Sequence, residues 1–557
     1  MYVRTTTRRN KDGSTVRYLQ LAESVWDAEH QRSQTRVLYN LGREDALDAD
    51  ALRRLAKSLL RVACPEELAR LQELQETSAE AARLRLEWAK EYGGVHVLHA
   101  LWRELGLGEE IVRACAERPS AAPLAEAAFL LVANRALAPE SKLGLYERWM
   151  EEIHWPAAEE VALHHLYLAL DLLAAEKARL EKEIFFRVAD LLSAEVDLVF
   201  YDTTSVYFES EEEDAEGEGI RRLGHSKDFR PGAPQIVVGL AITREGLPVK
   251  SWIWPGNTAD VSTIEQVKRE LAGWRLNRVV YVADGGMMSE ANLSTLARGG
   301  SGYIVGVPLR KSKEAQAVLS RPGRFQTVAQ NLEVKEIAYP SAAEEPVAER
   351  RRRYVLCRNP EEARRQQHRR EELLRELEAK IKALEARAEA HPKAACRLQA
   401  NRRFGPYLKQ RANGRLVIDR VKVAQEEKLD GKWLVITNDL SLSAEDVALG
   451  YKQLLRVEES FRRLKHGIDI RPVHHRTPER IEAHVFACVL ALLIERVAEL
   501  RTGRHWGEIR REVSRLKMVA YEGPGGRVLQ TTEPTAEQRK LFQAMKIETP
   551  KLVHHVG

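Results

Sequence analysis

The sequence predicts a multidomain α/β protein, and three observations lead to this class. A chain of 557 residues is too long for a single hydrophobic core. Hydrophobic residues make up 44% of the chain and charged residues 30%, which excludes a largely disordered protein. Between residues 195 and 309, apolar strand-like runs alternate with amphipathic helical patterns in the order strand, strand, strand, helix, strand, helix, strand. This order indicates an α/β sheet of mixed direction.

Two segments precede this sheet. Residues 1–47 alternate apolar and polar positions around an Asp-Gly turn and therefore predict a small N-terminal β domain. Residues 48–194 are rich in alanine, leucine, glutamate and arginine with a helical period. Pieces of helix-turn-helix size in this helical region could bind a DNA end, although packing in a bundle is the commoner use of such a pattern.

Three segments follow the first part of the sheet. Residues 310–443 are polar and Arg-rich and predict an α+β insertion. Residues 444–503 return to the core with an amphipathic helix at 451–465 and a second helix at 481–500, which is apolar on most sides and should be buried. Residues 504–557 are expected to form a C-terminal tail that could contact DNA or a second subunit.

Positive charge is concentrated in one stretch of the chain. The net charge is only +5, yet residues 350–370 hold nine arginines against two glutamates. Such a block is commonly a solvated surface. The alternative is a strip that binds phosphates.

The cysteines and apolar runs bear on the compartment. The five cysteines are scattered without a CxxC pair, so neither a zinc site nor a disulfide framework is indicated. The N-terminus lacks the apolar region of a signal peptide, and the longest apolar run, 485–494, has ten residues where a membrane span needs about twenty. We therefore expect a soluble cytoplasmic protein with no membrane segment.

Two aspartates follow strands that should be neighbours. Asp202 closes the apolar run VDLVFY, and Asp284 closes VVYVA just before two glycines. Chemistry in α/β sheets gathers beyond the carboxyl ends of strands. Either aspartate alone could cap a turn, but together they form a candidate pair of ligands for Mg²⁺, which prefers oxygen donors. Two such ions can support an in-line phosphoryl displacement.

A third carboxylate is expected on the helix YKQLLRVEESFRRLK. Glu458 lies seven residues after Tyr451 and seven before Lys465, so on a straight helix these side chains share one stripe along the border of the buried face. Arg462 lies beside Glu458, whereas Glu459 points well away. The alternative is an ordinary rim of charges on an amphipathic helix.

Five motifs, in this order, resemble those of one family. The motifs are VFYDTTSVYFE, GHSKDFRPGAPQIVVGL, WPGNTAD, VYVADGGMMSEANL and the stretch from YKQLLRVEESF to RIEAHV. They resemble the DDE transposases of bacterial insertion sequences, and most of all the insertion-sequence-four superfamily with its Tyr-Arg-Glu-Lys signature. The resemblance covers residues 195–500, and the N-terminal segment is also similar to this group. It implies an RNase H-like catalytic core, a mixed sheet with flanking helices, interrupted by an insertion between the second and third carboxylates.

The resemblance also implies which residues act. By position, the catalytic and metal-binding carboxylates are Asp202, Asp284 and Glu458. The implied cofactor is Mg²⁺ or Mn²⁺, with two ions in each active site. The gap between the second and third carboxylates is where the Arg-rich insertion lies, so the arginines there are expected to follow a DNA backbone.

Signature residues and further candidates should contact DNA. Tyr451 and Lys465 match residues that hold terminal DNA phosphates, but the arginine of the signature falls where this chain has Leu454, so Arg462 is the substitute candidate. The other candidate DNA contacts are Lys227, Arg471, His475, Arg351 and Arg352. The loop that carries Lys227 could also be a plain turn. Trp433 could stack on a flipped base, although packing in a strand is the commoner role.

The predicted function is a DNA transposase of the cut-and-paste type. It should cleave transposon ends that carry terminal inverted repeats and transfer the strands into target DNA. Both ends must be held together, so a homodimer in a synaptic complex is expected. Two alternatives stay open: an RNase H-like nuclease without a joining step, and a DNA-binding regulator descended from a transposase. The presence of all three carboxylates argues against the regulator.

Overall fold

The computed structural model divides the chain into two compact units. The residues that it describes are 1–9, 15–27, 32–64, 85–116, 121–193, 197–215, 217, 219–274, 276, 279–310, 312–337, 352–386, 392–412, 414–523 and 526–556. The smaller unit comprises Met1–Ala89, Val519–Gln530 and Val553–Gly557, and the larger unit comprises Lys90–Met518 and Thr531–Leu552. The predicted Asp-Gly turn near the N-terminus lies outside the described residues.

The smaller unit begins with the predicted N-terminal sheet. Strands β1 (Tyr2–Arg9), β2 (Thr15–Asp27) and β3 (Arg32–Arg43) pair antiparallel in that order. Helix α1 (Ala49–Ala63) follows, and the Asp48 side chain caps it by accepting a hydrogen bond from a backbone amide of the first turn. The small N-terminal sheet predicted from the alternating pattern is confirmed.

A second sheet joins distant segments of the chain. Its order is β18-β17-β16-β4, with β4 at Arg85–Glu91, β16 at Lys517–Gly523, β17 at Gly526–Thr531 and β18 at Val553–Val556. The sequence predicted helix for the stretch that forms β4 and a tail for the last segment. Both expectations differ from the structure, because this pairing joins parts of the chain that are more than 400 residues apart.

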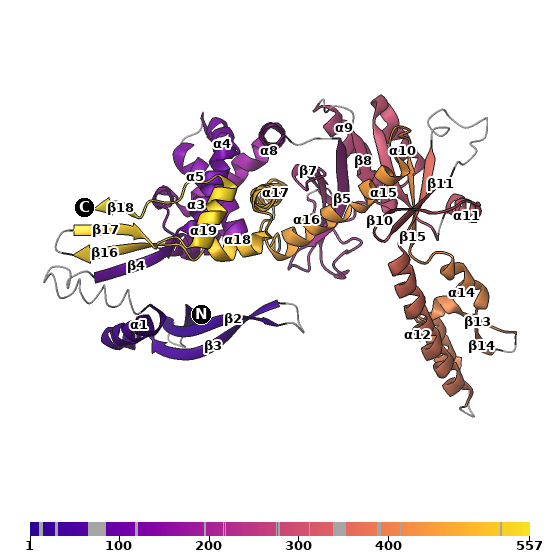
Figure 1. Cartoon of the computed structure of the whole chain (residues 1–557), viewed down its shortest axis with the longest axis horizontal. Coiled ribbons are helices and arrows are strands. Elements are labelled where there is room, and N and C mark those ends of the chain that lie inside the picture. The colour runs from indigo at the N-terminus through magenta and orange to yellow at the C-terminus, as the bar shows by residue number, and fades with distance from the viewer. Residues whose placement is uncertain are drawn as a thin grey trace. The chain divides into compact units, whose positions relative to one another are not determined.

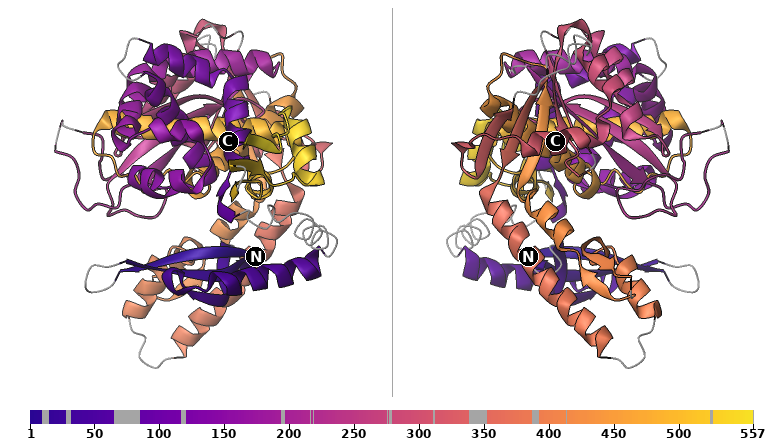
Figure 2. Two further views of the ribbon diagram at one scale, coloured as in Figure 1. Left: turned by 90° about the vertical axis from the view of Figure 1, so that its left-hand side faces the viewer. Right: turned by 90° about the vertical axis from the view of Figure 1, so that its right-hand side faces the viewer.

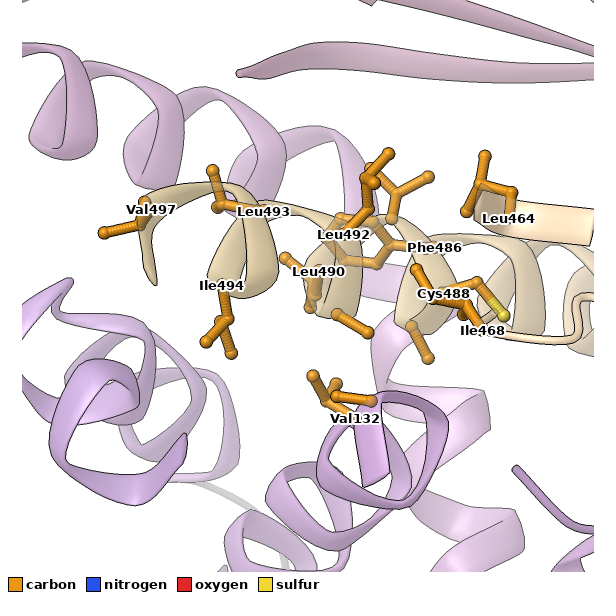
Figure 3. Close-up of a cluster of buried hydrophobic side chains, with 14 of the residues drawn as sticks. Val132, Leu464, Ile468, Phe486, Cys488, Leu490, Leu492, Leu493, Ile494 and Val497 are labelled. Carbon is orange, nitrogen blue, oxygen red and sulfur yellow. The ribbon is translucent and has the colours of Figure 1, made fainter. Parts of the chain in front are cut away.

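The helical part of the larger unit packs around α17 (Pro478–Thr502). The helices around it include α3 (Gly93–Glu104), α5 (Ala121–Leu137) and α8 (Leu163–Leu191). As its apolar sequence predicts, α17 is buried along nearly its whole length, and Figure 3 shows its side chains against Val132 of α5 and Leu464. Within the described part of the chain, no single helix is long and apolar enough to cross a membrane, although Ala121–Leu137 and the bent continuation Lys142–Glu152 reach that length and composition together.

Shorter elements complete this helical part. They are α4 (Leu107–Cys115), α6 (Lys142–Gly144), a π-helical turn (Leu145–Trp149), α7 (Met150–Glu152), a 3₁₀ turn (Pro156–Glu160), α18 (Trp506–Val513) and α19 (Ala536–Met545). Helices α18 and α19 pack against α3 and α17. Much of the predicted C-terminal tail is therefore part of the folded body.

A nine-stranded mixed sheet is the main sheet of the larger unit (Figure 1). The predicted strands are β5 (Leu198–Tyr207), β6 (Gln235–Ile242), β7 (Pro248–Pro255), β8 (Val280–Ala283) and β9 (Gly302–Val307). Strand β8 pairs in parallel with β5 and β9, whereas β6 pairs antiparallel with β5 and β7. Helices α9 (Ile264–Ala272) and α10 (Glu290–Ala297) occupy the predicted positions before and after β8. The predicted mixed α/β sheet is confirmed.

Alternate residues of β5 face two different hydrophobic clusters. Val199 and Tyr201 pack in a cluster with side chains of α9 and α10. Leu198 and Phe200 pack in the other cluster, which includes side chains of α16 and α17. Because successive side chains of a strand point to opposite faces, helices cover both faces of the sheet.

The predicted insertion contributes strands to this same sheet. Strands β10 (Gln326–Ala329), β11 (Leu332–Ile337), β12 (Arg353–Arg358) and β15 (Lys432–Thr437) extend it beyond β9. Helix α11 (Lys313–Ser320) precedes them. Residues 310–443 are thus not wholly separate from the core, in contrast to the expected insertion subdomain.

The rest of the insertion forms an arm, which comprises α12 to α14. Its elements are α12 (Pro360–Glu385), α13 (Pro392–Ala400), β13 (Leu408–Gln410), β14 (Leu416–Ile418) and α14 (Arg420–Glu427). Helix α12 projects from the sheet, with α14 and the β13–β14 pair beside it (Figures 1 and 2). The arm has its own small core of four buried side chains, namely Leu377, Phe404, Leu408 and Leu416.

The predicted straight helix at 451–465 is two helices. Helix α15 ends at Lys452 and α16 begins at Leu455, their bounds being Ala444–Lys452 and Leu455–His466. Tyr451 therefore belongs to α15, whereas Glu458 and Lys465 belong to α16. Of the three side chains expected along one straight helix, only Glu458 and Lys465 share a helix.

Leu377→Ala should loosen the arm without affecting the sheet. The substitution removes a fully buried side chain from a core of four and should cost about 2–5 kcal/mol. We expect faster amide hydrogen exchange in α12–α14 and unchanged protection in β5, β8 and β9, measured by mass spectrometry. Arg375→Ala, at an exposed position of the same helix, is the control. Equal loss of protection in the sheet would contradict a separate core.

Glu495 should make the stability of the protein depend on pH. It is buried in α17, and this burial raises its pKa to about 8 against the opposing charge of Arg463. Because the folded pKa exceeds the ordinary value of 4.5, the folded state retains a proton that the unfolded state releases. The stability contributed by this proton is present below the ordinary pKa and is lost as the pH rises through about 8.

Glu495→Gln should remove this dependence. The melting temperature of the variant, relative to the unaltered protein, should therefore increase from acidic pH to above pH 8, as measured by thermal unfolding in a series of buffers. Glu508→Gln, at an exposed position of α18, should follow the unaltered protein at every pH. Parallel curves for the protein and Glu495→Gln would refute the assignment.

Candidate active site

The parallel pairing of β5 and β8 places two carboxylates side by side. The paired residues end at Tyr201 and Ala283, and the next residue of each strand is Asp202 and Asp284. Asp202 lies inside β5, which continues along β6, whereas Asp284 follows the last residue of β8. Both side chains fall on the same face as Phe200, which is the face that α16 covers.

Tyr451 connects α15 to this pair. Its hydroxyl donates a hydrogen bond to Asp284 Oδ1 at 3.1 Å. Burial raises the pKa of Tyr451, and the negative charges of Asp284, Asp202 and Glu458 raise it further. Gly306 of β9 makes room for the ring, because a Cβ atom there would collide with the Tyr451 hydroxyl. The structure thus joins Asp284 to Tyr451 by a hydrogen bond, whereas Asp202 and Glu458 influence the hydroxyl only through their charges.

Burial and several neighbouring charges act on the carboxyl group of Asp202. Burial raises its pKa to about 6, while the Lys227 ammonium and the Thr203 amide, which donates to Oδ1 at 2.7 Å, act in the opposite direction. The charges of Asp284 and Asp260 raise the pKa further. A partly buried carboxylate with like-charged neighbours favours a nearby cation.

The Glu458 carboxylate is not close enough to Asp202 and Asp284 for the three to hold one metal ion. It is exposed on α16 and forms no hydrogen bond or ion pair with any described residue. Among the described histidine, cysteine, aspartate and glutamate side chains, no three are arranged closely enough to hold one metal ion. A shared ion therefore requires the Glu458 side chain to turn toward Asp202 and Asp284.

Asp260 was not among the predicted site residues. Its carboxylate accepts a hydrogen bond from Thr203 Oγ1 at 2.5 Å and pairs with Lys227 Nζ at 3.0 Å. Lys227 also donates to the Thr203 carbonyl at 2.8 Å. Asp260 thereby holds the predicted phosphate contact, Lys227, beside Asp202. The motif WPGNTAD contained this residue, but nothing in its spacing indicated the contact.

Asp228 pairs with two of the predicted DNA contacts. Its Oδ1 atom lies 2.8 Å from Lys465 Nζ, and its Oδ2 atom lies 2.9 Å from Arg471 Nη1. The Arg471 guanidinium also lies over the ring of Tyr207, 4.9 Å from its centroid. Burial lowers the pKa of Lys465, and Asp228 opposes this change. This carboxylate fixes two cations that α16 and the following loop supply.

Arg462 and Arg456, the two arginines that could replace the signature arginine, lie on different sides of α16. Arg462 is exposed and pairs with no described side chain, so it is free to approach a ligand. Arg456 is held by the carbonyl of Arg244, to which its Nη1 donates at 2.6 Å. Leu454, at the signature position, is buried between the two helices. The geometry leaves Arg462 as the substitute candidate.

Four arginines of the Arg-rich block pair with acids outside it. Arg352 pairs with Glu290 of α10, and its side chain is nearly buried. The other three pairs are Arg353 with Glu336, Arg358 with Glu333 and Arg370 with Asp430. Arg365 pairs with Glu361 inside the block, whereas Arg364 and Arg369 are exposed and form no ion pair with a described residue. Arg351 lies outside the described residues. A contact between this block and DNA stays a prediction.

Two further candidates are packed into the protein. Trp433 lies on β15 opposite Cys357 and packs against the main hydrophobic core. His475 is buried, and burial together with the nearby charges of Lys142 and Arg480 lowers its pKa to about 3. Trp433 is only half-buried, and His475 is buried but lines a cavity, so base stacking by Trp433 and a contact between His475 and DNA stay predictions.

The fold and the carboxylates define a class of enzyme: RNase H-like proteins that cleave or join nucleic acid strands. Residues 201–494, more than half of the chain, match the family model described as "Transposase DDE domain". Residues 3–87 match the model described as "IS1634 family transposase, N-terminal domain". The chain therefore belongs to the DDE transposases of bacterial insertion sequences, enzymes that act on DNA and depend on divalent metal ions. The finer assignment to the insertion-sequence-four superfamily stays a prediction.

Solved transposase structures show distant similarity. A piggyBac transposase synaptic complex with hairpin DNA matches at 10% identity and a TM-score of 0.33, over 75% of this chain and 79% of that chain. A Mos1 transposase paired-end complex matches at 15% identity and a TM-score of 0.13, over 28% and 56%. No curated protein matches the sequence. Both scores are low, so the assignment rests on the family models.

Glu458 and Glu459 offer an internal comparison for the site. The charge of Glu458 raises the pKa of Tyr451, whereas the charge of Glu459 raises the pKa of Arg463, on another side of α16. Glu458→Gln should therefore reduce metal-dependent cleavage of transposon-end DNA by at least about a hundredfold, and Glu459→Gln should leave it within about twofold. Gel analysis of labelled end fragments measures both rates. If Glu459→Gln were the inactive variant, the assumed orientation of α16 would be wrong.

Proposed function

We propose that this transposase uses Asp202, Asp284 and Glu458 for cut-and-paste transposition. It would cleave DNA at transposon ends and join the freed 3′ ends to target DNA. The observation that carries the proposal is the side-by-side placement of Asp202 and Asp284 on the face that α16 covers. Glu458, on α16, is the proposed third ligand.

The donor set fits hard divalent cations. All three ligands are carboxylates, and the raised pKa of Asp202 reflects burial and a like-charged neighbour, which a cation would offset. We assign two Mg²⁺ or Mn²⁺ ions to the site. When bound, such ions activate the attacking water or 3′-hydroxyl and stabilise the leaving 3′ oxygen.

Other residues of the chain orient the carboxylates and the DNA. The Tyr451 hydroxyl fixes the direction of Asp284 through their hydrogen bond. Lys465 and Arg471 share the carboxylate of Asp228, so this group of three side chains carries one net positive charge that would attract a strand phosphate. Arg462 is exposed on the same helix as Glu458 and can add a further phosphate contact.

Transposition also requires two DNA ends to be held at once. A homodimer that binds one terminal inverted repeat with each subunit would satisfy this requirement with one repeated interface. Such a synaptic complex would form on bacterial DNA, which places the enzyme in the cytoplasm.

Asp284→Asn tests the assignment directly. It keeps the size of the side chain but removes the negative charge that a metal ion requires, so cleavage and joining should fall by at least about a hundredfold. Labelled transposon ends incubated with target DNA and Mg²⁺ report both products. End binding, measured by gel shift, should stay within about twofold.

Asp190→Asn, at an exposed position of α8, is the control and should retain both activities. Intact cleavage and joining by Asp284→Asn would overturn the metal-site assignment. Cleavage without any joined product in the unaltered protein would instead indicate a nuclease, and unchanged DNA without cleavage would indicate a DNA-binding regulator.

A further inference from the structure

A basic cavity lies beside the loop that follows α16. Its volume is about 390 Å³, and its walls come from α5, α6, α8, the loop after α16 and α17. The lining side chains on which the argument depends are Arg135, Lys142, Tyr167, Arg471, His475 and His484. Two acidic residues, Glu140 and Asp469, line the cavity as well. Several residues of the RPVHHRT motif line this cavity, and the proposed chemistry gives most of that motif no other role.

Lys142 is buried in this wall without an acidic partner. Only 7% of the residue is exposed, and its Nζ atom lies 3.0 Å from His484 Nδ1. His484 Nε2 lies 2.8 Å from the Ile470 carbonyl, to which it must donate, so Nδ1 is the acceptor for Lys142. No described carboxylate forms an ion pair with Lys142. Two of the three possible ammonium donors therefore remain available.

Arg135 adds a second buried cation. It is 5% exposed, and its guanidinium donates to the carbonyls of Asp469, at 3.1 Å, and Glu140. The carboxylates of Asp469 and Glu140 lie near enough to oppose the lowering of the Arg135 pKa by burial, and the Glu140 carboxylate also pairs with Arg148. Burial, with the nearby charge of Arg135, lowers the pKa of Lys142 to about 7. A buried ammonium group without an ion-pair partner is costly unless an anion can enter the cavity beside it.

Four other described lysines of the same unit are buried. Lys177 and Lys250 both pair with the carboxylate of Glu181, at 2.9 and 3.3 Å. Lys268 and Lys335 have no acidic partner among the described residues, but each lies over an aromatic ring, that of Tyr281 and that of Phe325. At Lys142 no described carboxylate or aromatic ring takes this place, and the cavity lies beside it.

We propose that this cavity binds a phosphate group, with Lys142 as its principal donor and Arg135 as the second charge. A monatomic anion would fill little of a space of about 390 Å³, whereas a phosphate with an attached sugar suits it. The Tyr167 and His475 rings in the wall offer surfaces for that attachment. A metal ion is disfavoured, because both ring nitrogens of His484 are already engaged.

Arg471 connects the cavity to the proposed DNA path. It lines the cavity and pairs with Asp228, which also holds Lys465. A DNA strand that follows Lys465 and Arg471 would therefore bring a phosphate to the mouth of the cavity. This origin of the phosphate rests on the proposed function, whereas free phosphate could enter without it, and the experiment separates the two sources.

Lys142→Met tests the site in the full-length protein. Inorganic phosphate should raise the melting temperature of the unaltered protein. The variant should bind phosphate at least about tenfold more weakly, because it lacks the charged donor. It should also melt no lower than the unaltered protein in phosphate-free buffer, since it removes a buried unpaired charge. Lys540→Met, at an exposed lysine, should keep the phosphate effect.

A second measurement does not depend on a variant. Acetic anhydride at neutral pH should acetylate Lys142, and phosphate should protect this lysine but not Lys540, as peptide mass spectrometry can show. A purely structural Lys142 would show no protection and would lower the melting temperature when replaced. Either the absence of protection or an unchanged phosphate effect in Lys142→Met would overturn the proposal.

Oligonucleotides identify the source of the phosphate. If DNA supplies it, a single-stranded oligonucleotide with a 5′-phosphate should bind more tightly than one with a 5′-hydroxyl, and Lys142→Met should abolish the difference. If only inorganic phosphate binds in a Lys142-dependent manner, the ligand is free phosphate. Because these measurements need neither metal nor cleavage, their failure is distinct from retained activity in Asp284→Asn, which would refute the proposed function.

Discussion

The parallel pairing of β5 with β8 is the constraint on which the candidate site depends. Backbone hydrogen bonds fix Tyr201 opposite Ala283, and this register brings Asp202 and Asp284 next to each other and onto one face. A shift of one residue would turn one of these carboxylates to the opposite face, toward α9 and α10. Much of the surrounding structure, including Gly306 and the packing of α16, positions groups against this fixed pair.

Local patterns allowed much of the core to be predicted. The short apolar runs of β5, β8 and β9 and the apolar sequence of α17 each specify burial by themselves, so their types and order could be assigned. The two aspartates were accessible for the same reason, because each follows such a run directly. To predict that the two aspartates meet, only one general rule was then needed, namely that α/β sheets carry their functional polar residues beyond the carboxyl ends of the strands.

Features that depend on distant partners could not be predicted. Strand β4 is defined by its place in a sheet with the C-terminal strands, and its own sequence reads as well as a helix. The break between α15 and α16 falls where no proline or glycine marks it. Asp260 and Asp228 act through contacts with Thr203 and Lys465, from other elements, which their sequence neighbours do not reveal. The ion pairs of Arg352, Arg353, Arg358 and Arg370 were not predictable either, because their acidic partners lie outside the Arg-rich block.

The way the arm joins the sheet has an evolutionary consequence. Strands β10, β11, β12 and β15 attach at the edge beyond β9, so the added chain leaves and returns without touching the β5–β8 pairing. Because loop closure costs grow only slowly with length, the arm can lengthen, shorten or be exchanged between lineages while the carboxylates stay in register. Changes in the arm can thus be selected without altering the register that places the two aspartates side by side.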